Sequence, residues 1–358
     1  MSPAPLLGRR AGLVGAALGL LAAGAAVGFT AEKLAVGRIR LRRDPEADEP
    51  FGSLRGTLVP VTATDGTPLY VEVDEAPDPG DDLTVIFCHG FSHNQDAWHY
   101  QRRDLRRVAR LVFWDQRSHG RSGRGAVDPD VLEQLGRDLQ SVIEATAPTG
   151  PLVLIGHSMG GMTIMSLAAE HPELFGGRVL GVGFIGTSAG DLARVTLGFP
   201  NVGIVRRVVP GALTAMARQA ELVERGRRAG SDIGFLITKK WSFASDVPPS
   251  VVEFAAEMIS STPIDVIASF FPTFDSYDRY AALAAFRQGL DVLVLVGDSD
   301  LLTPEDHSRA IVQEVPAARL VVVPSAGHLV MLEHPDVVTS ELLGLISDVR
   351  AKLRVESA

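Results

Sequence analysis

Short runs of apolar and β-branched residues recur along the chain and alternate, in its later part, with segments of helical pattern. The eight runs are residues 57–61, 69–74, 83–88, 110–115, 152–155, 179–185, 291–296 and 319–323. The helical segments lie at about 96–109, 129–146, 159–170, 304–315 and 335–354. Strands that alternate with helices predict a mostly parallel sheet covered on both faces. We therefore expect an α/β fold on an eight-stranded sheet, with a hairpin turn through Asp65-Gly66 between the first two strands.

Residues 188–289 interrupt this alternation. The segment contains no convincing strand, and its helical pieces are broken by Pro and Gly. A connection this long without structure of its own is uncommon in a compact domain. We therefore predict a helical cap at 188–289, inserted between two parts of one core at 57–187 and 290–358. A helical layer with no role at the site is the alternative.

The N-terminal region has a different composition from the rest. Residues 11–29 contain no charged or strongly polar side chain, and as a helix they would extend about 28 Å, close to the hydrocarbon thickness of a bilayer. Residues 1–43 carry basic residues on both sides of that stretch, and 44–56 is a polar segment with Pro and Gly. We predict an N-terminal transmembrane helix that contacts membrane lipid, followed by a linker at 44–56. A cleaved secretory signal and a buried helix are the alternatives.

The charge around the apolar stretch bears on its orientation. Lys and Arg are denser after residue 29 than before residue 11, which favours a cytoplasmic catalytic portion on a single-pass anchor. Secretion after cleavage of residues 11–29 is the alternative.

The overall composition excludes several function classes. The net charge is −9, from 34 Lys and Arg against 43 Asp and Glu, which is not the footprint of a nucleic-acid-binding protein. Cys88 is the only cysteine, so the chain can form no internal disulfide, and no Cys/His cluster has metal-binding spacing. We expect no nucleic-acid partner and no metal.

The stretch LVLIGHSMGG, residues 152–161, places Ser158 between an apolar run and a helical pattern. A serine at a sharp strand-to-helix turn has a strained backbone, and its neighbours two positions away must be small for strand and helix to approach. Such a turn exposes the serine hydroxyl and points the N-terminus of the following helix at negative charge that forms beside it. The sequence thus predicts a nucleophile at Ser158.

A serine nucleophile needs a histidine base and an orienting carboxylate. Asp298 and Asp300 follow the run at 291–296, and His328 follows the run at 319–323 in a loop of small residues. Because parallel strands end at one edge of the sheet, these side chains are expected near Ser158.

Five segments give the chain a specific resemblance to the α/β-hydrolase family. They are FCHGF (87–91), WDQRSHGRS (114–122), GHSMGG (156–161), GDSDLLTP (297–304) and GHLVMLEHP (327–335). The resemblance extends over about residues 57–355. It implies that Ser158 is the nucleophile, His328 the base and Asp300, rather than Asp298, the acid. It also implies backbone N–H groups of Phe91 and Met159 as oxyanion donors, and no cofactor.

The reaction class follows from the nucleophile. Related epoxide hydrolases and haloalkane dehalogenases resemble this pattern but carry Asp where this chain has Ser158, so both are disfavoured. We expect a serine esterase or lipase that acts on a small-molecule or lipid acyl ester. A thioester or C–C hydrolase, a hydroxynitrile lyase, a perhydrolase, and a non-catalytic ligand receptor or membrane scaffold remain alternatives.

Other polar residues near the motifs receive structural interpretations. In the family, the position of His89 usually orders the oxyanion loop. We interpret His157 as packing, and we do not expect His119 or His334 to act as the base. The arginine run at 102–110 is expected to form a solvated face. The aromatic patch at 269–280 could either line an acyl pocket or seat the cap on the core.

Overall fold

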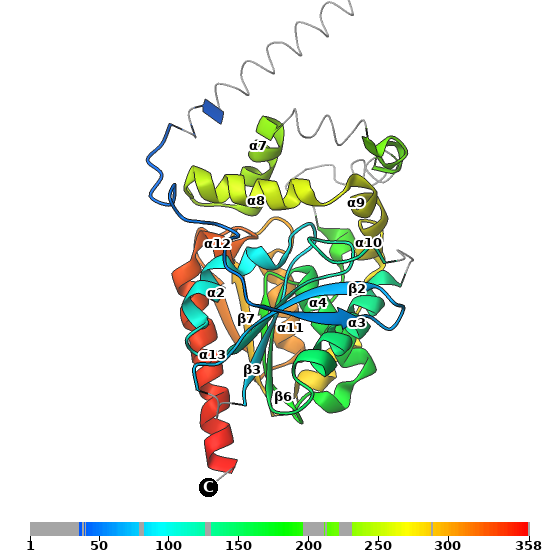
Figure 1. Ribbon diagram of the computed structural model, residues 1–358, viewed down its shortest axis with the longest axis vertical. Coiled ribbons are helices and arrows are strands. Elements are labelled where there is room, and N and C mark those ends of the chain that lie inside the picture. The colour runs from blue at the N-terminus through cyan, green and yellow to red at the C-terminus, as the bar shows by residue number, and fades with distance from the viewer. Residues whose placement is uncertain are drawn as a thin grey trace, which may run out of the picture.

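A central sheet organises the computed structural model, which describes residues 36–37, 39, 41–78, 82–125, 130–195, 211, 213–221, 231–287 and 289–356 (Figure 1). The eight strands are β1 (Thr57–Thr62), β2 (Pro68–Asp74), β3 (Thr84–Cys88), β4 (Arg110–Asp115), β5 (Leu152–His157), β6 (Val179–Ile185), β7 (Asp291–Gly297) and β8 (Arg319–Val323). They are ordered β1-β2-β4-β3-β5-β6-β7-β8. Strand β2 pairs antiparallel with β1 and β4, and all the other pairs are parallel. The predicted eight-stranded, mostly parallel sheet is confirmed.

Helices cover both faces of the sheet (Figure 1). The core helices are α2 (His99–Leu105), α3 (Val131–Thr146), α4 (Met159–Glu170), α11 (Glu305–Glu314), α12 (Val330–Glu333) and α13 (Pro335–Glu356), with short 3-10 turns η1 (Gln95–Trp98) and η2 (Pro172–Leu174). Alternate side chains of β3 point to opposite faces: Val85 and Phe87 join the apolar cluster under α13, and Ile86 and Cys88 join the cluster under α3 and α4. Because both faces are buried, the inner strands are apolar throughout, as expected for parallel strands.

Short helices lie between β6 and β7, where the sequence predicted a cap. They are η3 (Leu192–Arg194), α7 (Ser231–Ser242), α8 (Pro249–Ser261), α9 (Ile264–Phe270), α10 (Thr273–Ser276) and η4 (Tyr280–Arg287). Among the residues described between β6 and β7, no strand occurs. Helices α7 to α10 lie beyond one end of the sheet, at the top of Figure 1.

Residues 41–56, which we call the strap, pack against both the cap and the core, although 44–56 was expected to be a linker. Both carboxylate oxygens of Asp44 accept hydrogen bonds from Ser250, one from its backbone N–H and one from its hydroxyl, each at 2.9 Å. Asp44 therefore caps the N-terminus of α8 from outside the helix. The Phe51 ring stacks on Phe254 of α8 with 4.7 Å between centroids, and Glu49 lies 2.7 Å from the ring of His99 in α2. The strap thus joins α8 of the cap to α2 of the core.

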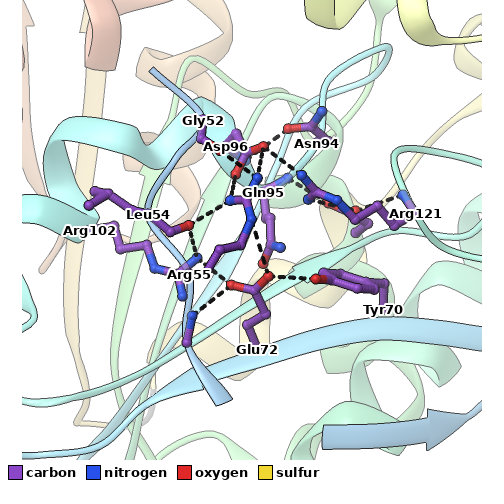
Figure 2. A network of polar contacts seen from close by, with 12 residues as sticks. Gly52, Leu54, Arg55, Tyr70, Glu72, Asn94, Gln95, Asp96, Arg102 and Arg121 are labelled. Atoms are coloured by element: carbon purple, nitrogen blue, oxygen red, sulfur yellow. Dashed lines mark hydrogen bonds and ion pairs between the residues drawn. The ribbon is translucent and has the colours of Figure 1, made fainter. Parts of the chain in front are cut away.

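Arg102 corrects the expectation that the arginine run forms a solvated face, because its side chain is buried. Its guanidinium contacts Glu72 at 2.8 Å and binds both carboxylate oxygens of Asp74, at 2.8 and 2.9 Å. Figure 2 shows Arg102, Arg55 and Tyr70 gathered around the Glu72 carboxylate, to which the Tyr70 hydroxyl donates at 2.7 Å. Burial of two carboxylates on β2 requires a cation that the sequence of α2 alone does not reveal.

The predicted transmembrane helix at 11–29 lies outside the described residues. Among the described residues, none of the helices has both the length and the apolar character needed to cross a bilayer.

Replacement of Arg102 by Met is expected to lower the free energy of unfolding by about 3–5 kcal/mol, because it leaves Asp74 buried without its cation and Glu72 with only Arg55, 3.8 Å away. Arg103→Met is the matched control. The Arg103 side chain is 41% exposed and pairs with Asp104 at the surface, so this replacement should lower the free energy of unfolding by less than about 1 kcal/mol. Urea unfolding of the two variants measures the difference. Equal losses for both would contradict this account of Arg102.

Candidate active site

Ser158 occupies a strained turn between β5 and α4, with φ 51° and ψ −118°. Glycine is required on both sides of it. A Cβ on Gly156 would lie 2.5 Å from the backbone of Gly160, and a Cβ on Gly160 would lie 2.1 Å from the carbonyl oxygen of Cys88. The close approach of helix to strand therefore depends on these glycines, and it holds a non-glycine residue at positive φ, a conformation that clusters at functional sites.

Asp300 and His328 form a buried pair on the loops that follow β7 and β8. His328 Nδ1 lies 2.8 Å from Asp300 Oδ2. The other carboxylate oxygen accepts the backbone N–H groups of Leu302 and Thr303, at 2.8 and 2.9 Å, and the Thr303 hydroxyl donates to Oδ2 at 2.9 Å. The carboxylate is thus fully oriented, and it holds the imidazole with Nε2 turned away from it.

Asp298, the alternative acid, lies in a different environment. It is exposed, and its carboxylate accepts from the neighbouring Ser299 hydroxyl at 2.8 Å. Hydrogen bonding, chiefly from Ser299, lowers its pKa. The structure places Asp300, and not Asp298, against His328.

The turn that carries Ser158 meets the His328 loop at the end of β6. The Ser158 N–H donates to the carbonyl of Ile185 at 3.0 Å, and a Cβ on the next residue, Gly186, would lie 3.6 Å from His328 Nδ1. His157, one position before the serine, places its Nε2 3.0 Å from the carbonyl oxygen of His328. In the part of the chain that the structure describes, His328 Nδ1 contacts Asp300 and no hydrogen bond joins Ser158 Oγ to His328 Nε2.

The loop after β3 brings Phe91 to the same place. Gly90 packs so closely on the serine turn that a Cβ there would lie 3.2 Å from Ser158 Cβ and 2.7 Å from His157 Nδ1. Among the described residues, neither the Phe91 N–H nor the Met159 N–H donates to a backbone carbonyl. Two free N–H groups beside a serine are the arrangement that stabilises an oxyanion.

Aromatic side chains of the cap cover this loop. The Phe270 ring is fully buried, 5.8 Å from the Phe91 ring and 5.3 Å from the His119 ring. The Tyr277 hydroxyl donates to the carbonyl of Met162 in α4 at 3.2 Å. Phe270 and Tyr277 therefore seat the cap on the core, while Phe274 and Phe91 remain partly buried in the same apolar cluster as Met159.

Three buried histidines near the site have at least one ring nitrogen without a hydrogen-bond partner in the described residues, and one of these nitrogens is Nδ1 of His157. In the described part of the chain, both ring nitrogens of His93 and Nε2 of His119 have no partner. Burial lowers the pKa of His93 to about 3, with the nearby His328 adding to the effect, and burial lowers the pKa of His119 to about 4. Sequence reasoning did not consider His93, because nothing local distinguishes it from a loop histidine.

Metal ligation has no candidate in the described ranges, where no group of three or more His, Cys, Asp or Glu side chains is arranged to hold an ion.

Residues 84–335 match the model of the alpha/beta hydrolase fold family. The chain belongs to this family. A relative from Caulobacter sp. (strain K31), named a carbamate hydrolase, is 26% identical over 284 residues, covering 78% of this chain and 96% of that protein. The sn-1-specific diacylglycerol lipase ABHD11 of Mus musculus is 26% identical over 266 residues, covering 72% of this chain and 80% of that protein.

The solved structure of a thermophilic esterase from Thermogutta terrifontis superposes with a TM-score of 0.63 at 26% identity, covering 82% of this chain and 98% of that one. The chain is thus a hydrolase of the alpha/beta hydrolase family, similar to esterases and lipases.

Acid should destabilise this hydrolase through its buried histidines. Between pH 7 and 5 the unfolded chain takes up protons at His93 and His119, while the folded chain does not, so the free energy of unfolding falls as the pH falls. His93→Phe removes one of these groups and is expected to reduce that fall by about 2 kcal/mol. Urea unfolding at pH 7 and pH 5 measures it, with His171→Phe at the surface as the control. A fall as large as that of the wild type would contradict the buried, neutral state of His93.

Proposed function

We propose that the chain is a serine hydrolase that cleaves a carboxylic ester through an acyl-enzyme intermediate. The observation that carries the proposal is the 2.8 Å contact between His328 and a fully oriented Asp300, beside a serine held at positive φ. A structural core has no need of a strained serine, an unpaired imidazole nitrogen and two unpaired N–H groups at one place.

The residues act in sequence. Ser158 Oγ attacks the acyl carbon while its proton passes to His328 Nε2, and Asp300 stabilises the imidazolium that forms. The carbonyl oxygen becomes an oxyanion and accepts the N–H groups of Phe91 and Met159. His328 then gives its proton to the leaving alcohol. Water repeats the attack on the acyl group with His328 as base, which releases the acid and restores Ser158.

An amphiphilic ester is the substrate class that we favour. The residues around the serine turn on the cap side are apolar, including Phe91, Met159 and Phe274, and would accept an acyl chain. Two of the similar proteins are named as an esterase and a diacylglycerol lipase, which supports an ester over a thioester or a C–C bond.

The proposed membrane anchor at 11–29 agrees with a lipid ester. Val36, a few residues further along, is buried in the same apolar cluster as Phe235 and Val251 of the cap helices. If residues 11–29 insert into a bilayer, the cap at 188–289 lies next to that bilayer, and the substrate can enter from it.

Ser158→Ala is expected to lower the hydrolysis of a p-nitrophenyl ester by about 10³- to 10⁶-fold and to abolish labelling by a fluorophosphonate probe, without loss of folding. Ser166→Ala, in the helix α4 that follows the nucleophile, is the matched control, since it also removes one serine hydroxyl and Ser166 is buried. Near-full turnover by Ser158→Ala would refute the nucleophile. A wild-type chain that binds acyl ligands but neither labels nor turns over would identify a receptor.

Asp300→Asn should reduce kcat by about 10³- to 10⁴-fold, because an amide can neither stabilise the imidazolium nor hold its Nδ1–H tautomer. Asp298→Asn, two positions away and exposed, should change kcat by less than about threefold. Steady-state kinetics of both variants on one ester measures the contrast. The reverse order would assign the acid to Asp298.

A further inference from the structure

Gln116 is a fully buried polar residue that directly follows β4 and that the reaction outlined above does not use. It makes two contacts with His89, which directly follows β3. Its backbone N–H donates to His89 Nε2 at 2.9 Å, and its side-chain NH₂ donates to the His89 carbonyl oxygen at 2.5 Å. Gln116 therefore contacts both the ring and the backbone carbonyl of His89.

These contacts determine the state of the His89 ring. Because Nε2 accepts a backbone N–H, the proton of the neutral ring must lie on Nδ1. Burial keeps the ring neutral by holding its pKa well below the ordinary value. Nδ1 then donates to the carbonyl oxygen of Gly90, 2.8 Å away.

The orientation of the next peptide follows from that bond. The C=O and N–H of a trans peptide point in opposite directions, and the described chain contains no cis peptide. Since the Gly90 carbonyl is drawn to the His89 ring, the Phe91 N–H of the same peptide faces away from it. The His93 N–H also donates to the Gly90 carbonyl, at 3.2 Å. Gln116, through His89, is thus one of the groups that set the direction of this proposed oxyanion donor.

The other end of the Gln116 side chain reaches helix α4. Its carbonyl oxygen accepts the Thr163 hydroxyl at 2.6 Å, and that hydroxyl also lies 3.0 Å from the carbonyl oxygen of Met159, the first residue of the helix. The amide orientation is fixed, because the His89 carbonyl can only accept. One planar amide thus connects the loop that carries the Phe91 N–H with the helix that carries the Met159 N–H.

We infer that Gln116 is a positioning residue that fixes the distance between the two oxyanion donors, with Thr163 as its contact on α4. The inference rests on the proposed function. Oxyanion donors act on the transition state far more than on the bound ester, so a change in their spacing lowers kcat and leaves KM nearly unchanged. A residue that only supports the fold would change stability without this split.

The test uses the full chain with Gln116→Leu, Gln116→Glu and Thr163→Val. Leu keeps the volume of Gln116 and removes both side-chain bonds, and a Glu carboxylate cannot donate to the His89 carbonyl. We expect kcat on a p-nitrophenyl ester to fall about 10- to 100-fold for both Gln116 variants and about 3- to 10-fold for Thr163→Val, with KM within about twofold. Inhibition by a trifluoromethyl ketone, which forms a tetrahedral adduct with the serine, should weaken in the same order.

Thr146→Val is the matched control, because Thr146 is also a buried helical threonine that donates to the carbonyl four residues earlier, at 2.7 Å from Val142, but belongs to α3. It should keep the wild-type kcat. The double variant Gln116→Leu with Thr163→Val should lose no more kcat than Gln116→Leu alone, since both remove the same connection.

The outcomes separate this inference from the proposed function. If the wild type labels at Ser158 and turns over the ester, but the Gln116 and Thr163 variants keep kcat within about twofold, the positioning role is overturned and the serine hydrolase stands. A rise in KM at constant kcat would also overturn it. A wild type that neither labels nor turns over would overturn both. If Gln116→Leu does not fold, the test rests on Thr163→Val, which preserves the side-chain shape. A kcat lower than that of Thr146→Val would then support the positioning role, and an equal kcat would overturn it.

Discussion

The contact between the N-terminus of α4 and the end of β3 is the constraint on which the rest of the site depends. The backbone of Gly160 lies so close to the Cys88 carbonyl that a single added Cβ would have to come within 2.1 Å of it. This proximity forces the turn at Ser158 into positive φ. It also brings Thr163 within reach of Gln116. Loss of this contact would displace both the Ser158 hydroxyl and the proposed oxyanion donors.

Parallel pairing then gathers the chemistry at one edge of the sheet. Since the strands from β4 to β8 run in one direction, every loop that follows them opens at the same edge. Those loops carry Gln116, Ser158, Gly186, Asp300 and His328 in chain order, and the loop after β3 adds Phe91. The Asp300–His328 pair is buried there, and three further hydrogen bonds to the Asp300 carboxylate limit the cost of removing it from water.

The cap is held from a second direction by the strap. Asp44 satisfies the start of α8, and Phe51 fills the space between α8 and α2. The strap precedes the core in sequence but contacts the cap that is inserted far later in the chain. A segment that precedes the core in sequence therefore helps to hold the cap on the core.

The sequence alone determined the elements whose signals are local. Eight apolar runs predicted eight strands, and the glycines around Ser158 predicted the sharp turn, because period and backbone freedom are properties of a few adjacent residues. The order of serine, aspartate and histidine allowed the candidate site to be located, although their roles remain proposals.

Only the tertiary structure decided which polar residues are buried and what they meet. Arg102 was expected in solvent, but its guanidinium lies between the carboxylates of Glu72 and Asp74. No sequence pattern indicated a role for Gln116, whose side-chain amide contacts His89 and Thr163. Each of these contacts joins residues far apart in the chain. A buried polar group depends on partners that the fold brings to it, and no local pattern encodes a partner whose position is set only when the sheet and helices pack.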